Sequence, residues 1–232
     1  MPAARLVLWD IDLTLVQAGP FGRQLYADAF LRATGRPLAF VAQMAGRLDQ
    51  DIYRDTLAGH DLDPADHPFP RFADALAAAY AGGTDELRRR GRALPGAAAA
   101  LAALAAVPGT VQTVLTGNVP AVARVKLAAF GLDRHLDLEA GAYGPDDHVR
   151  AGLVPLAQRR AGARHGAVFD RGNTVLIGDT PHDVAAGHEG GARVIAVATG
   201  RASAEELRAA GAGVVLPDLS DTPGLLALVV GE

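Results

Sequence analysis

Short runs of strand-forming apolar residues alternate with helical patterns along most of the chain. The runs that indicate strands span residues 6–9, 111–115, 174–177 and 193–197, with weaker ones at 135–138 and 214–216. They are apolar on both faces, as strands of a parallel sheet covered by helices should be. Helical patterns span residues 94–107, 119–130, 149–162, 182–190, 203–211 and 222–230. The predicted fold class is therefore α/β, with a doubly wound, Rossmann-like parallel sheet.

The first predicted strand is followed by a long helical segment. About a hundred residues separate it from the second strand, far more than an ordinary connection needs. Residues 17–91 show helical patterns that end at glycine or restart at proline, and no strong strand pattern. We therefore expect a helical cap domain over residues 17–91, hinged at 16–20 and 91–96. The core domain is then made of residues 1–16 and 92–232.

Composition narrows the classes of partner. Half of the 232 residues are hydrophobic, the net charge is −4, and the basic residues are scattered, which argues against nucleic acid or an anionic membrane as a partner. The absence of cysteine excludes disulfides, thiol nucleophiles and zinc–thiolate sites. The alanine-rich segment 93–107 is too short to span a bilayer, and Asp10 interrupts the N-terminal apolar run that a signal peptide would need. We expect a cytoplasmic protein with a small soluble ligand; the oligomeric state stays open.

Polar motifs follow three of the predicted strands. They read DIDLT at 10–14, TGN at 116–118 and GDTPHD at 178–183. Because ligands of open parallel sheets bind outside the carboxyl ends of the strands, we expect a common site that contains Asp10, Asp12, Thr116, Asn118, Asp179 and Asp183. Four crowded carboxylates raise one another's pKa or require a cation. Magnesium, held between carboxylates and a substrate phosphate, meets that requirement, so the motifs point to a phosphate ester.

Lysine is almost absent from the chain. Of the 22 basic residues, 21 are arginine and the remaining one is Lys126. An ammonium and a guanidinium are not interchangeable, so this lysine is a candidate functional residue. It lies about two turns into the helix predicted after TGN, and helical side chains lean toward the N-terminus, so its ammonium can reach the site.

Taken together, these motifs resemble those of the haloacid dehalogenase superfamily. The layout is similar to its phosphatase branch with a helical cap inserted after the first motif, as in phosphoglycolate phosphatases. The resemblance covers the whole chain and includes, more loosely, the cap segment MAGRLDQDI at 44–52. Most members of the superfamily are magnesium-dependent phosphatases, and that activity is what the resemblance implies for this chain.

The resemblance also implies roles for the two aspartates of the first motif. Asp10 would be the nucleophile that forms an aspartyl-phosphate, and Asp12 the acid that protonates the leaving alcohol and then the base that activates water. A carboxylate nucleophile splits one hard displacement into two easier ones, and a nearby carboxylate is a suitable general acid and base. Asp10, the Asp12 carbonyl and Asp179 would hold Mg²⁺, with Asp183 in direct or indirect contact with the ion.

Substrate contacts are implied for the second motif and for the cap. Thr116 would bind the transferring phosphoryl group, with Gly117 and Asn118 as substrate-binding residues at a helix N-terminus; Asn118 has a helix N-cap as its alternative role. Lys126 would balance the charge of Asp10 and of the phosphoryl oxygens. In the cap, Arg47 and Asp49 are candidates for contacting the leaving group.

Some features depart from the family pattern or are assigned no chemistry. Leu13 stands where the family commonly has glycine, which weakens analogies about the substrate but not about the aspartate pair. His182 is interpreted as a helix-start residue. Arg150 is interpreted as structural. The only serines, Ser203 and Ser220, lack a G-x-S-x-G context.

Alternatives within and outside the family stay open. The phosphonate-cleaving branch is excluded because the inserted segment contains no lysine, and Asp12 favours phosphoryl transfer over dehalogenation. A phosphosugar mutase keeps both aspartates and is the nearest enzyme alternative. A regulatory module that is phosphorylated on aspartate, or binds metal, without turnover is the alternative from another class. We expect a magnesium-dependent phosphomonoester hydrolase that acts on a small phosphorylated metabolite, such as phosphoglycolate or a sugar phosphate.

Overall fold

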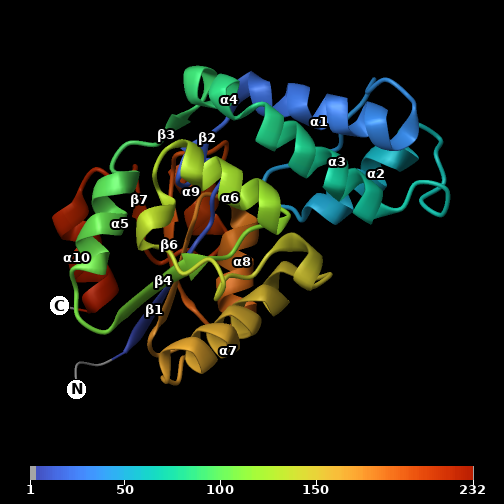
Figure 1. The fold of residues 1–232 in the computed structure, drawn as a ribbon. Helices are drawn as coiled ribbons and strands as arrows, with labels where there is room; N and C mark the ends of the chain where they lie inside the picture. The colour runs from blue at the N-terminus through green and yellow to red at the C-terminus, as the bar shows by residue number, and fades with distance from the viewer. Residues whose placement is uncertain (1–3, 232) are drawn as a thin grey trace.

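A five-stranded parallel sheet forms the centre of the molecule. The computed structural model describes residues 4–231, and the sheet has the order β4-β1-β5-β6-β7 (Figure 1). Its strands are β1 (Arg5–Trp9), β4 (Thr110–Val114), β5 (Thr174–Gly178), β6 (Arg193–Val197) and β7 (Val215–Leu216). The predicted doubly wound α/β class is confirmed, and β1 lies between the strands that precede the TGN and GDTPHD motifs.

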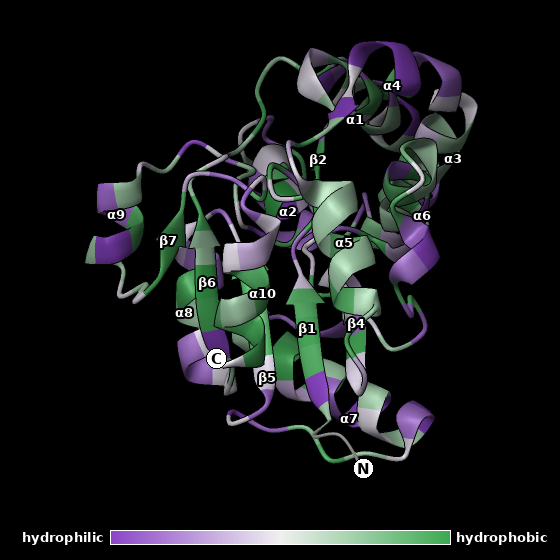
Figure 2. Cartoon of the chain, turned by 90° about the vertical axis from the view of Figure 1, so that its left-hand side faces the viewer, coloured by the Kyte–Doolittle hydropathy of each residue, from purple (hydrophilic) through white to green (hydrophobic). Residues whose placement is uncertain are grey.

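Helices cover both faces of the sheet because β1 is apolar on both. Val7 and Trp9 point to the face covered by α5, α6 and α10, while Leu6 and Leu8 point to the face covered by α7 and α8. All four side chains are fully buried, and each stabilises the fold by about 1.5–3 kcal/mol relative to exposure. Figure 2 shows the resulting run of hydrophobic strands. The helices are α5 (Ala97–Ala105), α6 (Pro120–Ala129), α7 (Leu153–His165), α8 (Pro181–Gly190), α9 (Ala204–Ala209) and α10 (Thr222–Val230).

A separate group of helices lies beyond the carboxyl edge of the sheet (Figure 1). It contains α1 (Gly19–Thr34), α2 (Asp49–Ala58), α3 (Phe69–Gly82) and α4 (Thr84–Arg90). These helices share a hydrophobic cluster of their own, in which the rings of Tyr53 and Phe72 stack with centroids 4.2 Å apart. The cluster extends to Val119 and Val122 at the start of α6. Helix α6 therefore packs against this helical group as well as against the sheet.

A short two-stranded ribbon joins the helical group to the sheet. Strand β2 (Val16–Gln17) pairs antiparallel with β3 (Arg92–Ala93). Both strands fall within the segments predicted as hinges, although the sequence did not indicate them. None of the described helices is long and apolar enough to cross a membrane.

Two predicted elements differ from the structure. The strand predicted at 135–138 is wrong: the chain forms a 3-10 turn over Asp133–His135. The Thr113 hydroxyl of β4 donates to the Asp137 carbonyl at 2.6 Å, and the backbone-to-backbone contact of Asp137 with β4 is one hydrogen bond, from its N–H to the Gln112 carbonyl at 2.8 Å. A single contact of this kind does not make a strand. The helix predicted at 149–162 begins as a separate 3-10 turn, Arg150–Gly152, before α7.

The turn after β1 contains a residue in an unfavourable backbone conformation. Leu13 has φ of 62°, in the left-handed region that favours glycine. Its N–H donates to the Val16 carbonyl at 2.8 Å, and its carbonyl accepts a hydrogen bond from the Thr199 hydroxyl at 2.5 Å. This explains why glycine suits the position, and it shows that the turn is maintained here by hydrogen bonds despite the leucine.

The left-handed backbone at Leu13 predicts that glycine is more stable than alanine at this position, the reverse of their order inside a helix. Both Leu13→Ala and Leu13→Gly remove the side chain, but only glycine relieves the left-handed conformation, so Leu13→Gly should be the more stable of the two by about 1 kcal/mol. Leu31, which is 48% exposed in α1, supplies the control: there the glycine variant should be less stable than the alanine variant by about 1 kcal/mol. Urea unfolding of the four variants measures both differences, and the same sign at both positions would contradict the argument.

Candidate active site

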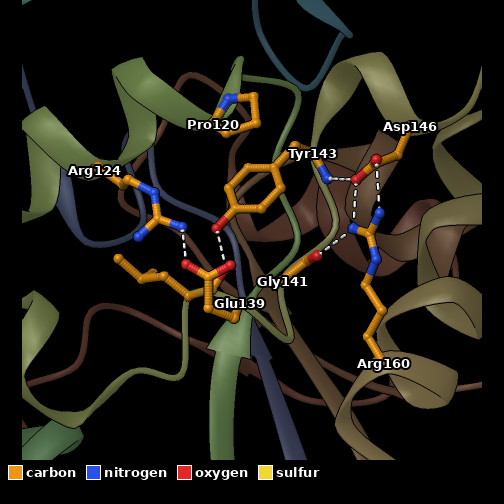
Figure 3. Close-up of a pocket in the computed structure, with 8 residues that line it drawn as sticks. Pro120, Arg124, Glu139, Gly141, Tyr143, Asp146 and Arg160 are labelled. Carbon is orange, nitrogen blue, oxygen red and sulfur yellow. Dashed lines mark hydrogen bonds and ion pairs between the residues drawn. The ribbon is translucent and has the colours of Figure 1, made fainter. Parts of the chain in front are cut away.

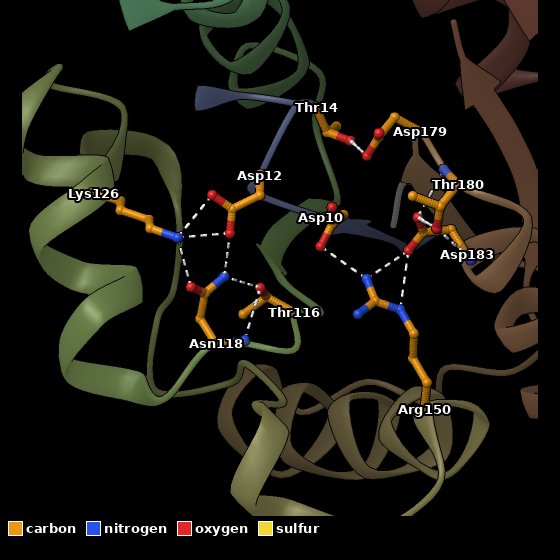
Figure 4. Close-up of polar contacts among 10 residues, drawn as sticks. All are labelled: Asp10, Asp12, Thr14, Thr116, Asn118, Lys126, Arg150, Asp179, Thr180 and Asp183. Carbon is orange, nitrogen blue, oxygen red and sulfur yellow. Dashed lines mark hydrogen bonds and ion pairs between the residues drawn. The ribbon is translucent and has the colours of Figure 1, made fainter. Parts of the chain in front are cut away.

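Three carboxylates from separate parts of the chain meet at the carboxyl edge of the sheet. Asp10 directly follows β1, Asp179 directly follows β5, and Asp183 lies in the first turn of α8. One oxygen from each lies within 4.8 Å of the others, and the residues are 5%, 1% and 0% exposed. Four clustered carboxylates were expected; the fourth, Asp12, is directed elsewhere (Figure 4).

A buried arginine lies within this cluster. The Arg150 guanidinium donates to Asp10 Oδ1 at 2.8 Å and to Asp183 Oδ1 at 2.6 Å (Figure 4). Arg150 is only 9% exposed. The structural role assigned to it from the sequence is therefore too narrow, because it is the cation in direct contact with the expected nucleophile.

The cluster retains excess negative charge despite Arg150. With all three carboxylates ionised, the single guanidinium leaves a formal charge of −2. Burial raises the pKa of Asp10 to about 7, and the charge of Asp183 adds to the shift while Arg150 opposes it. Burial likewise raises the pKa of Asp179 to about 9, with added repulsion from Asp10 and Asp183. A divalent cation would neutralise the excess charge and lower both pKa values.

Asp179 supplies the most direct indication of a missing ligand. Its Oδ1 accepts a hydrogen bond from the Thr14 hydroxyl at 3.2 Å, while its Oδ2 is buried and has no partner among the described residues. An unsatisfied buried oxygen is costly and needs an explanation. A Cβ at Gly200 would lie 1.8 Å from this oxygen, so only glycine at that position leaves room for the Asp179 carboxylate itself. Hard divalent cations bind such oxygens, and the residues present therefore fit a metal ion.

Asp183 is more fully engaged than Asp179. Its Oδ1 accepts from Arg150, and its Oδ2 accepts from the Thr180 backbone N–H at 3.1 Å and from the Thr180 hydroxyl at 2.6 Å. The bond from the Thr180 N–H, together with the bond that the Asp183 N–H donates to the Thr180 hydroxyl at 3.2 Å, forms a capping box that starts α8. Asp183 therefore fixes the loop of the third motif and the orientation of Arg150.

Asp12 belongs to a second network beside the cluster. Lys126 Nζ lies 2.7 Å from both carboxylate oxygens of Asp12 and 2.7 Å from Asn118 Oδ1, and it sits over the Tyr80 ring. Burial acts to lower the pKa of Lys126, but the charge and hydrogen bonding of Asp12, together with Tyr80 and Asp49, outweigh that effect and raise the pKa. We expected Lys126 to face Asp10, but its ammonium contacts Asp12 instead. In Figure 4, Asp12 lies between Lys126 and Asp10.

The second motif completes this network. The Asn118 side-chain amide donates to Asp12 Oδ2 at 2.8 Å and to the Thr116 hydroxyl at 2.7 Å. Val119, not Asn118, occupies the N-cap position of α6. Thr116 and Asn118 are buried, whereas the Asp12 side chain is 46% exposed. Asp12 therefore presents a carboxylate that solvent or a ligand can reach, held on one side by an ammonium and an amide.

The structure does not bring the Arg47 side chain into either network. Its guanidinium donates to Asp55 and to the Gln43 carbonyl, both within the helical group. The Arg47 carbonyl, in contrast, lies against Gly117. His182 lies in the exposed first turn of α8, where a helix-start residue was expected.

Sequence reasoning did not place Arg150 in the site because its position follows no predicted strand. It lies at the start of a 3-10 turn after the GPDDHV segment, residues 144–149. From there its side chain extends to Asp10 and Asp183. The available signal was weak: an arginine directly before the small residues Ala151 and Gly152 at a helix start. Only the packing of that turn against α8 shows where the side chain goes.

A separate surface pocket lies beside Tyr143 (Figure 3). Its charged side chains are paired with one another, Arg124 with Glu139 at 2.6 Å and Arg160 with Asp146 at 2.7 Å. No charged group on its wall is left to select a ligand, so we assign the chemistry to the carboxylate cluster.

Comparison with known proteins identifies relatives of this chain. A family model described as HAD-hydrolase-like matches residues 150–222, which include Arg150, Asp179 and Asp183. A probable phosphatase IndB from Dickeya dadantii is 34% identical over 137 residues, 58% of this chain and 56% of that protein. The match thus spans little more than half the length of that relative.

Two further proteins match over nearly their full length. The plasmid-encoded phosphoglycolate phosphatase of Cupriavidus necator is 31% identical over 225 residues, 95% of this chain and 92% of that protein. The crystal structure of a hydrolase from Pseudomonas syringae has the same fold, with a TM-score of 0.70 and 22% identity over 98% of this chain and 99% of that one. The chain therefore belongs to the haloacid dehalogenase-like hydrolase superfamily and is a phosphatase of that superfamily.

Proposed function

We propose that this phosphatase is a magnesium-dependent phosphomonoester hydrolase that acts through an aspartyl-phosphate on Asp10. The observation that carries the proposal is the buried, unpartnered Oδ2 of Asp179 within a cluster of three carboxylates. Such an oxygen is expected where a hard cation belongs.

Three groups are suited to hold the ion. We assign direct contacts to the carboxylates of Asp179 and Asp10 and to the backbone carbonyl of Asp12, and we assign Asp183 the orienting role that its hydrogen bonds favour. When bound, Mg²⁺ would neutralise the negative charge of these carboxylates and of a substrate phosphate.

The first chemical step would transfer the phosphoryl group to Asp10. An Asp10 oxygen forms a bond to phosphorus while the bond from phosphorus to the ester oxygen breaks, and Asp12 gives its proton to the departing alkoxide. Arg150, 2.8 Å from Asp10 Oδ1, would hold the nucleophile in place and offset negative charge in the transition state. This role replaces the one first assigned to Lys126.

The second step would release phosphate and restore Asp10. Asp12 takes a proton from water, the hydroxide oxygen bonds to phosphorus, and the bond from phosphorus to Asp10 breaks. Lys126 and Asn118 hold the Asp12 carboxylate within 2.8 Å, so the base is already oriented when water arrives. Thr116, whose hydroxyl lies in the same network, is proposed to bind the phosphoryl group together with the Gly117 and Asn118 N–H groups.

We assign the helical segment 17–91 as a cap domain that encloses the substrate. Its helices lie beyond the sheet edge that carries the site, and a lid in that position excludes water and selects the leaving group. The name of the Cupriavidus relative suggests phosphoglycolate or a similarly small soluble phosphate ester as the substrate. Such a substrate fits an enzyme of the cytoplasm.

A panel of phosphorylated metabolites assayed for phosphate release tests the proposed function. Magnesium-dependent release from p-nitrophenyl phosphate and from at least one small metabolite is expected. Asp10→Asn should lower kcat at least about 1,000-fold because the amide is a poor nucleophile. Isomerisation of a sugar phosphate without net phosphate release would instead favour a mutase, and phosphorylation of the protein without turnover would favour a regulatory module.

The proposed role of Asp12 predicts that the Asp12→Asn variant releases nitrophenolate in an initial burst. Nitrophenolate leaves without needing a proton, so the first step should proceed, while hydrolysis of the aspartyl-phosphate lacks its base. Stopped-flow absorbance should show a burst of nitrophenolate equal to the enzyme concentration, followed by turnover at least about a hundredfold slower than in the wild-type enzyme. A variant that turns over at the wild-type rate would remove Asp12 from the mechanism.

The raised pKa values predict how magnesium stabilises the protein. The folded, metal-free protein holds protons on Asp10 and Asp179 that the unfolded chain releases near 3.8. Its stability should therefore fall as pH rises toward about 7 for Asp10 and about 9 for Asp179. Because the ion binds the ionised carboxylates, Mg²⁺ should raise the melting temperature more at about pH 8.5 than at about pH 6.

Scanning calorimetry with Mg²⁺, against NaCl at matched ionic strength, measures this effect. Asp179→Asn should lose most of the magnesium-dependent increase at both pH values. A larger increase at the lower pH, or an equal increase in Asp179→Asn, would contradict the assignment of the metal site.

A further inference from the structure

The start of α2 lies directly on the loop that carries the second motif. The Asp49 N–H donates to the Gly117 carbonyl at 2.9 Å, and Asp49 Oδ2 accepts from the Val119 N–H at 3.0 Å. Asp49 is 8% exposed. One residue of the helical group thus binds the TGN loop at two points, one on each side of Asn118.

Neighbouring contacts show that the start of α2 packs closely against several loops of the core; we call this contact the seating of α2. A Cβ at Gly117 would lie 2.0 Å from the Arg47 carbonyl, and a Cβ at Gly46 would lie 2.4 Å from the Thr180 hydroxyl. The Gln50 side chain donates to the Asp147 carbonyl at 2.8 Å. Segment 46–50 therefore touches the loops of the second and third motifs and the loop that precedes Arg150.

The Asp49 contacts bear on the orientation of Asp12. Helix α6 has Val119 as its N-cap and no side-chain cap of its own, so Asp49 supplies an acceptor to this helix start from another part of the chain. Asn118 and Lys126, which hold the Asp12 carboxylate, lie on that loop and helix. A shift of the loop would therefore move two of the groups that orient the expected acid and base.

We propose that Asp49 is a positioning residue: by binding the loop on both sides of Asn118, it keeps Asp12 aligned only while the start of α2 is seated on the core. The inference rests on the proposed function of Asp12. It gives cap closure a second effect besides covering the substrate, since departure of Asp49 would release the TGN loop. Release of the product would then coincide with loss of the aligned base.

Three variants distinguish the effect of the Asp49–Val119 hydrogen bond from the effects of the Asp49 charge and of α2 stability. Asp49→Ala removes the acceptor, whereas Asp49→Asn keeps a carbonyl oxygen that accepts from the Val119 N–H. Asp51→Ala is the matched control, because Asp51 also lies in the first turn of α2 and pairs with Arg54 at 2.8 Å on the same helix.

Steady-state kinetics with p-nitrophenyl phosphate and Mg²⁺ test the catalytic effect. In Asp49→Ala, kcat should fall at least about tenfold while KM stays within about threefold of the wild-type value. Asp49→Asn should keep kcat within about threefold, and Asp51→Ala should leave it unchanged. A normal kcat in Asp49→Ala, or equal losses in the alanine and asparagine variants, would overturn the proposal.

Amide hydrogen exchange tests the seating independently of activity. In the wild-type protein, the amides of Asp49 and Val119 should show equal protection, because one unseating event exposes both. Val119 should lose its protection in Asp49→Ala and keep it in Asp49→Asn and Asp51→Ala. An unprotected Val119 amide in the wild-type protein would overturn the seating itself, whether or not the enzyme turns over and whether or not Asp49→Ala folds.

Discussion

Mutual repulsion among buried carboxylates is the constraint on which the rest of this structure depends. Asp10, Asp179 and Asp183 approach within 4.8 Å in a place from which water is nearly excluded. Like charges in such surroundings are stable only with protons or cations between them. Arg150 supplies one positive charge, and the unpartnered oxygen of Asp179 marks the position where a second cation is needed. Burial by the hydrophobic sheet is thus what makes this cluster a candidate metal site.

The same constraint divides the polar residues into two groups with different duties. Arg150, Asp179 and Asp183 lie around the Asp10 carboxylate, while Lys126 and Asn118 hold Asp12 and Thr116 contacts Asn118. In the mechanism that we propose, separate cations for the two aspartates allow Asp10 to act as a nucleophile while Asp12 exchanges a proton. Asp49 of the helical segment contacts the loop of this second group, and by our proposal this contact ties the orientation of Asp12 to the position of that segment.

Sequence reasoning identified the site residues that directly follow strands, but it did not predict the contacts of residues that lie elsewhere. Asp10 and Asp179 could be placed together because parallel strands present their carboxyl ends at one edge, whatever the details of packing. Lys126 was recognised by its rarity and its position on a helix, but its partner was misassigned. Arg150 and Asp49 were noted in the sequence, but their contacts were not predicted, because each depends on how a loop packs against an element distant in the sequence.

The sequence by itself determined the sheet, its helical insertion and the residue types of the site, since apolar periodicity and motif spacing are local properties. Leu13 is an instructive case: a leucine where glycine is expected is readable from the sequence, but its φ of 62° and the Thr199 hydrogen bond are not. Tertiary structure alone decided which cation faces Asp10 and which carboxylate oxygen is left without a partner. The physical reason is that charge pairing depends on directions and distances of a few ångströms, which are set only when the whole core has packed.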